Sequence, residues 1–308
     1  MEDFPQTLLE FEERFSSEEA CREYLFHLRW PDGFVCPRCG LGAAWHTNRD
    51  LYRCGSCDYQ GSVTAGTIFQ DTKKPLRLWF RAMWYITSQR QGVSALGIQQ
   101  VLGLGSYRTA WMWLHKLRAA MVRPGRDNLS GTIEIDETYI GGVKPGRRGR
   151  GALGKTLVLV AVEDKNSRIG RIRLRQVSDA SAKSLTTAVT ECVAPESMIR
   201  TDCWKGYGNL SQLGFTHHAV RHDAHVGENL LPMVNLVVSL LKRWLVGTHQ
   251  GAVRPSHLDY YLDEFTFRFN RRTSRSRGKL FHRLAQQAVS VSPLMGKQIA
   301  GDRHNGNH

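Results

Sequence analysis

Two aspartates, Asp136 and Asp202, stand where a β-sheet could bring their carboxylates side by side. Asp136 lies in an alternating segment in which Glu134 and Thr138 share its face, while isoleucines point to the other face. Two neighbouring carboxylates repel each other unless a hard divalent cation lies between them, and Mg²⁺ prefers such oxygen ligands. The pair therefore predicts a magnesium site. For the segment around Asp136 alone, a half-buried strand with a solvated polar face is the alternative.

The helix-like segment from Met233 to Val246 offers two further polar residues, Asn235 and Lys242, but no acid. They are seven residues apart, which is two helical turns, so both lie on one face. The amide oxygen of Asn235 can ligate a cation without adding charge, and Lys242 can hold a phosphate. Two ions about 4 Å apart could activate a water or a 3′-hydroxyl for phosphodiester displacement. The alternative for Asn235 is a solvated polar residue of a helix.

The elements around these residues predict an α/β core. Three strands are expected first, near 131–140, Leu157–Glu163 and Ile169–Val177. A helix follows at Ser181–Val193, and then a fourth strand at Ser197–Cys203, with Asp202 at its carboxyl end. This is the order of a ribonuclease-H-like core, a mixed sheet with helices in which the first strand lies beside the fourth. That neighbourhood would bring Asp136 and Asp202 together.

Four cysteines form two pairs, each with two intervening residues, and fourteen residues separate the pairs. They are Cys36, Cys39, Cys54 and Cys57. Both thiolates of such a pair can reach one tetrahedral ion, so the spacing predicts a zinc ribbon with one structural Zn²⁺. A redox Cys-x-x-Cys is the alternative, but two such pairs in tandem disfavour it. Basic and aromatic residues between the pairs are candidate nucleic-acid contacts: Arg38, Arg49, Tyr52, Arg53 and Tyr59.

A helix-turn-helix is predicted between the ribbon and the core. Residues 94–101 form the first helix, a glycine turn follows, and Ser106 caps the second helix. Polar residues on the second helix are expected to contact phosphates or base edges: Tyr107, Arg108, Thr109, His115, Lys116 and Arg118. The alternative is a plain helical hairpin. The expected domains are an N-terminal helix at 1–30, the ribbon at 31–63, the helix-turn-helix region at 64–124, the catalytic domain at 129–290 and a disordered tail at 291–308.

The formal charge of +14 favours a polyanionic partner, and nucleic acid is the commonest. Basic residues expected to follow DNA lie in the glycine-rich loop 141–154 and near the carboxyl end: Arg147, Arg148, Arg150, Arg243, Arg271 and Arg272. A solvated charged face is the alternative. No basic leader or long apolar run is present, so we expect a soluble protein of the cytosol and nucleoid. Glu264 is the rival third metal ligand, although its phenylalanine neighbours favour structural pairing with an arginine.

Several stretches together resemble the transposases of bacterial insertion sequences in the zinc-ribbon DDE group. They are the strand around Asp136, Thr201–Tyr207, Leu240–Arg243, Gly247–His249 and Leu262–Arg272. The resemblance covers roughly residues 20–290, and the ordered set is more specific than the cysteine spacing. In that family the third catalytic position varies among Glu, Asn and His, with a lysine seven residues later. Asn235 and Lys242 match this pattern, and Asp136 and Asp202 match the first two acids.

The resemblance implies DNA cleavage at transposon ends and transfer of the 3′-ends into target DNA, with Mg²⁺ or Mn²⁺ bound by Asp136, Asp202 and Asn235. Pairing of two inverted-repeat ends implies at least a dimer. The chain departs from the commoner pattern at Pro232 and Val238, and Pro232 predicts the start of the helix. A zinc-ribbon DNA-binding regulator, a catalytically inactive transposase copy and a structure-specific nuclease remain as alternatives.

Overall fold

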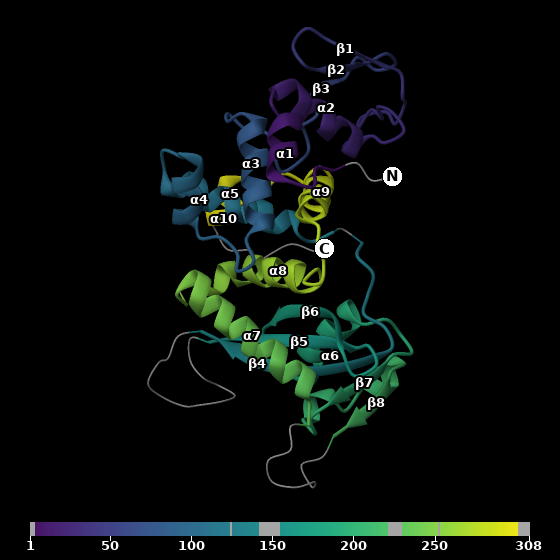
Figure 1. Cartoon of the computed structure of the whole chain (residues 1–308). Coiled ribbons are helices and arrows are strands. Elements are labelled where there is room, and N and C mark those ends of the chain that lie inside the picture. Colours follow the sequence, from purple (N-terminus) through teal and green to yellow (C-terminus); the bar gives the residue numbers. More distant parts are fainter. Residues whose placement is uncertain (1–3, 124, 142–154, 221–229, 252, 301–308) are drawn as a thin grey trace. The chain divides into compact units, whose positions relative to one another are not determined.

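The computed structural model describes residues 4–123, 125–141, 155–220, 230–251 and 253–300. The chain divides into two compact units, and each is described by itself. The first consists of Met1–Gly125 together with Thr273–His308, and the second of Arg126–Arg272 (Figure 1). Among the described residues, no helix combines the length and the apolarity that crossing a bilayer requires.

The first unit is mainly helical and carries a small antiparallel sheet. Its helices are α1 (Leu8–Arg14), α2 (Glu18–Arg29), α3 (Leu76–Ser88), α4 (Ala95–Leu102), α5 (Tyr107–Ala120), α9 (Arg277–Ala288) and α10 (Gly296–Ala300). Its strands are β1 (Ala44–His46), β2 (Tyr52–Cys54) and β3 (Gln60–Gly61), in that order. Ser94 and Ser106 cap α4 and α5, and Gly103 between them adopts a left-handed conformation with φ 61°. The predicted helix pair with a glycine turn is confirmed.

The carboxyl-terminal boundary of the second unit differs from the prediction. The second unit ends at Arg272, because α9 packs in the first unit, where the Phe281 ring lies 5.2 Å from Phe11 and 5.6 Å from Phe80. These ring contacts are long-range in sequence, so no local signal near residue 280 reveals them. The predicted disordered tail from residue 291 also needs correction, because α10 lies within it and Ile299 is fully buried.

The second unit is built on a five-stranded sheet of order β6-β5-β4-β7-β8. Its strands are β4 (Thr132–Ile140), β5 (Thr156–Asp164), β6 (Ile169–Val177), β7 (Met198–Thr201) and β8 (Thr216–Ala219), and its α-helices are α6 (Ala182–Cys192), α7 (Pro232–His249) and α8 (Leu258–Phe269). Short 3₁₀ turns lie at Lys205–Tyr207, Leu210–Leu213 and Pro255–His257. β4 to β6 form an antiparallel meander, and β7 joins β4 in parallel. The predicted ribonuclease-H-like strand order is confirmed.

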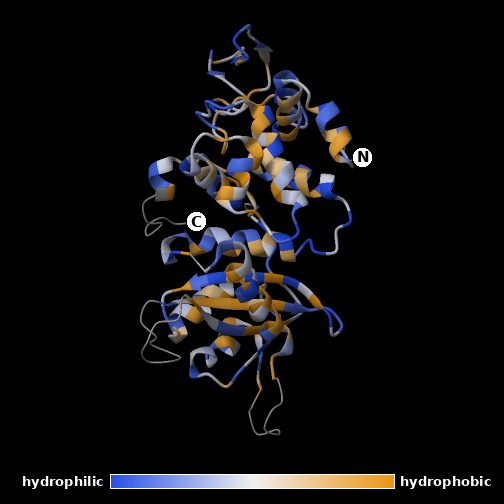
Figure 2. Cartoon of the chain, turned by 60° about the vertical axis from the view of Figure 1, so that its left-hand side comes forward, coloured by the Kyte–Doolittle hydropathy of each residue, from blue (hydrophilic) through white to orange (hydrophobic). Residues whose placement is uncertain are grey.

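Helices cover both faces of this sheet, so apolar side chains on both faces of its strands are buried. The side chains of α6 pack with Ile133, Ile135 and Leu159 on one face. The side chains of α7 and α8 pack with Val158 and Val160 on the other. Figure 2 shows the resulting apolar band along the strands. A strand buried on both faces reads as a continuous hydrophobic run, which is why β5 carries Leu157 to Val162 without a polar interruption.

Candidate active site and zinc centre

Asp136 lies on β4, and Asp202 directly follows the end of the neighbouring strand β7. The parallel register of β4 and β7 ends with Glu134 opposite Arg200, and each aspartate stands two residues beyond that pair. Adjacent strands are about 4.8 Å apart, so this register brings the backbone at the two aspartates to neighbouring positions at one end of the sheet. Oδ1 of Asp136 accepts a hydrogen bond from the Glu137 backbone N–H at 2.8 Å, which fixes its orientation.

The segment after β7 holds the second aspartate. The backbone N–H of Trp204 donates to Oδ1 of Asp202 at 3.0 Å, and the Trp204 indole N–H donates to the Ala180 carbonyl oxygen at 3.0 Å. A Cβ on Gly206 would lie 2.7 Å from the indole nitrogen and 2.8 Å from Leu185, so only glycine fits against this anchored ring. The orientation of Asp202 therefore depends on close packing between this segment and α6.

Sequence reasoning missed a partly buried pair formed by Glu137 and Tyr207. The Tyr207 hydroxyl donates to Oε2 of Glu137 at 2.7 Å. Burial raises the pKa of Tyr207 well above its usual range, and the charges of Glu137, Asp136 and Asp202 raise it further. A signal existed in the sequence, because Glu137 occupies the isoleucine face of the alternating strand, where a charged side chain needs a buried partner.

Helix α7 begins at Pro232, which confirms the predicted start. It packs against β4 and β5. Asn235 and Lys242 are both exposed and lie two turns apart on one side of the helix. Partial burial lowers the pKa of Lys242, and the neighbouring positive charge of Lys155 lowers it further.

A second residue that the sequence did not single out for a role is Glu134. Its carboxylate is fully buried, and Oε2 accepts hydrogen bonds from the backbone N–H groups of Met233 (2.9 Å) and Val234 (3.2 Å). Its position on the face of Asp136 was predicted, but a contact across about 100 residues has no local signal. The rival ligand Glu264 is instead paired with Arg268, whose Nη2 lies 2.8 Å from its Oε1. The expected structural pairing of Glu264 is therefore confirmed.

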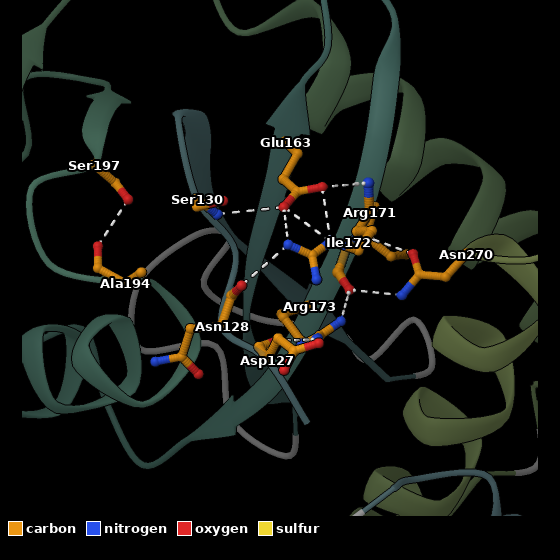
Figure 3. A network of polar contacts seen from close by, with 10 residues as sticks. All are labelled: Asp127, Asn128, Ser130, Glu163, Arg171, Ile172, Arg173, Ala194, Ser197 and Asn270. Carbon is orange, nitrogen blue, oxygen red and sulfur yellow. Dashed lines mark hydrogen bonds and ion pairs between the residues drawn. The ribbon is translucent and has the colours of Figure 1, made fainter. Parts of the chain in front are cut away.

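A polar network braces the part of the core around β5 and β6 (Figure 3). Glu163 is 2% exposed and pairs with Arg171, whose Nη2 lies 2.5 Å from Oε1. The Glu163 carboxylate also accepts from the Ser130 backbone N–H at 3.3 Å, while Arg171 donates to the Asn128 carbonyl oxygen at 3.1 Å. The network ties the chain that enters β4 to the following two strands.

Two residues at the carboxyl end of this unit, Asn270 and Arg272, form hydrogen bonds with the edge strand β6. The Asn270 side chain accepts from the Ile172 backbone N–H at 2.7 Å and donates to the Ile172 carbonyl oxygen at 3.2 Å (Figure 3). Arg272 donates to the carbonyl oxygens of Ile169 and Gly170. An exposed strand edge is a template for pairing with another chain, and these side chains occupy part of it.

The predicted DNA-contacting residues differ in accessibility. Arg108 and Arg243 are exposed. Lys116 is half-buried and donates to the Ile68 carbonyl oxygen at 3.3 Å. The Arg271 guanidinium lies 4.1 Å from the centroid of the Phe267 ring. Arg147, Arg148 and Arg150 lie outside the described residues.

Two residues that the sequence placed among the phosphate contacts of α5 are wrongly assigned. His115 is fully buried and Arg118 is 2% exposed, so neither side chain faces a phosphate backbone. The buried face of α5 is therefore wider than the predicted apolar stripe, because it includes His115 and Arg118 as well as Trp113, Leu114 and Leu117.

The four cysteines converge as predicted. Their Sγ atoms all lie within 4.8 Å of one another, with Cys36 and Cys57 3.7 Å apart and Cys39 and Cys54 3.5 Å apart. A tetrahedral ion with Zn–S bonds of about 2.3 Å places its sulfurs about 3.8 Å apart, so this donor set fits Zn²⁺. A hydrogen bond from the Ser56 backbone N–H lowers the pKa of the Cys54 thiol, which favours a thiolate at that sulfur. At Cys39 the Leu41 backbone hydrogen bond lowers the pKa, but burial and the neighbouring sulfurs outweigh it and raise the pKa, so the thiols titrate as an interacting group.

Two family models match the chain. The ISXO2-like transposase domain matches residues 128–270, and the transposase zinc-ribbon domain matches residues 16–60. An uncharacterized protein in transposable element ISH50 of Halobacterium salinarum is 27% identical over 291 residues, covering 86% of this chain and 94% of that protein. An uncharacterized transposase-like protein of Haemophilus influenzae is 24% identical over 117 residues, covering 37% of this chain and 92% of that protein.

Proposed function

This chain belongs to the insertion-sequence transposases of the DDE type with an N-terminal zinc ribbon, and from that membership we propose that it catalyses DNA transposition. It binds the terminal inverted repeats of its element, cleaves the donor strand and joins the 3′-ends to target DNA. The observation that supports the proposal is the parallel pairing of β4 with β7, because Asp136 and Asp202 each follow the last pair of that register, Glu134 and Arg200, by two residues.

Three side chains would hold the catalytic ions. Asp136 and Asp202 supply two carboxylates, and Asn235 adds a neutral amide oxygen from α7, which packs against β4. This all-oxygen donor set suits Mg²⁺ or Mn²⁺. When bound, the ions would lower the pKa of the attacking hydroxyl and stabilise the leaving oxygen.

The remaining groups would orient the DNA. Lys242 lies about 10 Å along α7 from Asn235, on the same side of the helix, and its ammonium would hold a phosphate of the bound DNA. Arg108 and Arg243 are exposed and would contact phosphates, and the zinc ribbon would help to recognise the ends. The pairing of two ends calls for at least a dimer, acting on DNA in the cytosol and nucleoid.

A DNA-binding regulator is the second candidate, because the third metal position is a neutral asparagine. A strand-transfer assay distinguishes the two functions. Purified wild type and Asp136→Ala are each incubated with a labelled terminal repeat in Mg²⁺, and the strand-transfer product is measured. A transposase loses product in Asp136→Ala while end binding in a gel-shift assay persists. The control is Asp164→Ala, which removes a turn aspartate that accepts from the Ser167 N–H. Equal product from wild type and Asp136→Ala would refute the proposal.

A further inference from the structure

The amino-terminal end of α7 has no capping side chain of its own. Its N-cap residue is Leu231, and Pro232 in the first position has no N–H. The Asn235 N–H is bonded to the Leu231 carbonyl oxygen at 3.0 Å. The N–H groups of Met233 and Val234 therefore need an acceptor from outside the helix, and both find Oε2 of Glu134.

The same carboxylate reaches a third element. Oε1 of Glu134 lies 3.5 Å from Nη1 of Arg200, the residue directly opposite it on β7. This is an ion pair without hydrogen-bond geometry. Glu134 therefore touches β7 and α7 from its place on β4, and its side chain is fully buried where they meet.

Each of these three elements carries, or ends beside, one proposed metal ligand near the contact with Glu134. Asp136 lies two residues beyond Glu134 on the same face of β4, and Asp202 directly follows the end of β7, two residues beyond Arg200. Asn235 directly follows Val234, which donates to Glu134. The buried Glu134 side chain thus lies two residues before Asp136, pairs with a residue two positions before Asp202, and accepts from the residue directly before Asn235.

We propose that Glu134 is a positioning residue for the metal site: its carboxylate fixes β4, β7 and α7 relative to one another, and so sets the separation of Asp136, Asp202 and Asn235. The inference rests on the proposed function of those ligands. It explains how a neutral amide can serve in the third position, because a ligand of low charge depends more strongly on being held in place. Substitution of groups that orient metal ligands typically weakens metal affinity roughly 10- to 100-fold.

The test is the Mn²⁺ concentration that half-saturates the protein, measured by electron paramagnetic resonance of free Mn²⁺, together with the Mg²⁺ dependence of strand transfer. In Glu134→Ala we expect both half-saturating concentrations to rise about 10-fold or more. Glu134→Gln keeps an acceptor for the two N–H groups but loses the charge opposite Arg200, so its rise is smaller. Asp136→Ala is the reference variant, and it gives the values expected when the metal site is lost.

Glu163→Gln is the matched control. Glu163 is also a buried carboxylate paired with an arginine and with backbone N–H groups, but it stands opposite Ile133, about 10 Å along β4 from Asp136. Its substitution should lower the melting temperature and leave both metal dependences at the wild-type value. A role for Glu134 in stability alone would give the same pattern in Glu134→Ala and Glu134→Gln, and that result would overturn the inference.

Failure of the proposed function has a different signature. The wild type would then give no strand transfer and no Mn²⁺ binding that Asp136→Ala removes, whatever residue stands at 134. A wild type that binds metal and transfers strands, with Glu134 variants of unchanged metal dependence, would remove only the positioning role.

Discussion

Replacing Glu163 by glutamine should destabilise the second unit without altering its chemistry. The carboxylate is 2% exposed and accepts from Nε and Nη2 of Arg171, from the Arg171 backbone N–H at 3.0 Å and from the Ser130 N–H. Glutamine removes the charge and turns one acceptor into a donor that faces other donors. Breaking a buried pair costs about 3–5 kcal/mol, and because Arg171 stays one-third exposed we expect about 3 kcal/mol.

The pH dependence of this loss gives a second check. Burial alone would raise the pKa of Glu163, but the hydrogen bonds and charge of Arg171 outweigh burial and hold that pKa below its ordinary value near 4.5. A depressed folded-state pKa stabilises the fold above the unfolded-state pKa, and this stabilisation is lost as pH falls through the folded-state pKa. The difference between wild type and Glu163→Gln is therefore full at pH 7 and shrinks below about pH 4.5.

Hydrogen exchange of the β5 and β6 backbone amides, followed by mass spectrometry, measures the free energy of opening of these strands. The loss of stability in Glu163→Gln is the decrease in that free energy relative to the wild type. The control is Glu191→Gln, because Glu191 forms an exposed pair with Arg175 at 3.5 Å and such pairs contribute about 0–1 kcal/mol. If Glu163→Gln changed the opening free energy no more than Glu191→Gln, the reasoning from burial would be wrong.

Two further predictions concern the ribbon and α7. Metal analysis of Cys54→Ser should find the Zn²⁺ of the wild type lost, because three thiolates do not close a structural site; zinc retained at one ion per chain would contradict the four-thiolate assignment. Because the pKa of Lys242 is lowered, its positive charge is lost at a lower pH than that of an ordinary lysine. The rate of strand transfer should therefore decline as the pH rises through this lowered pKa, which gives an alkaline limb in the pH–rate profile. Lys242→Arg should move the decline to higher pH in a pH–rate profile, and an unchanged limb would exclude Lys242 as its cause.

The elements were predictable from the sequence where local signals define them. Ser106 caps α5 as expected, and the helix expected from Ser181 begins there, with Ser181 as its cap. A serine hydroxyl before an apolar helical stripe is a local signal, because the cap and the N–H groups it binds lie within one turn. Pro232 fixed the start of α7 in the same way. The order of these elements then sufficed to predict that β4 and β7 are neighbours, because the first and fourth strands of such a core lie side by side.

What escaped prediction depends on contacts between residues far apart in the chain. The bond between Glu134 and the N–H of Met233 spans 99 residues, and the bond between Tyr207 and Glu137 spans 70. Burial of His115 depends on what covers α5, which helical spacing alone does not give. Tertiary packing decides all three, so the sequence yielded the proposed ligands but not the groups around them.

The most direct test of the central claim is strand transfer by Asp136→Cys in Mg²⁺ and in Mn²⁺, beside the wild type and Asp136→Ala. Mg²⁺ demands oxygen ligands, whereas Mn²⁺ accepts a thiolate more readily. If Asp136 binds the catalytic ion, the wild type is active in both metals, Asp136→Ala in neither, and Asp136→Cys gives product only in Mn²⁺. Wild-type activity in Asp136→Ala, or the absence of any metal preference in Asp136→Cys, would contradict the account.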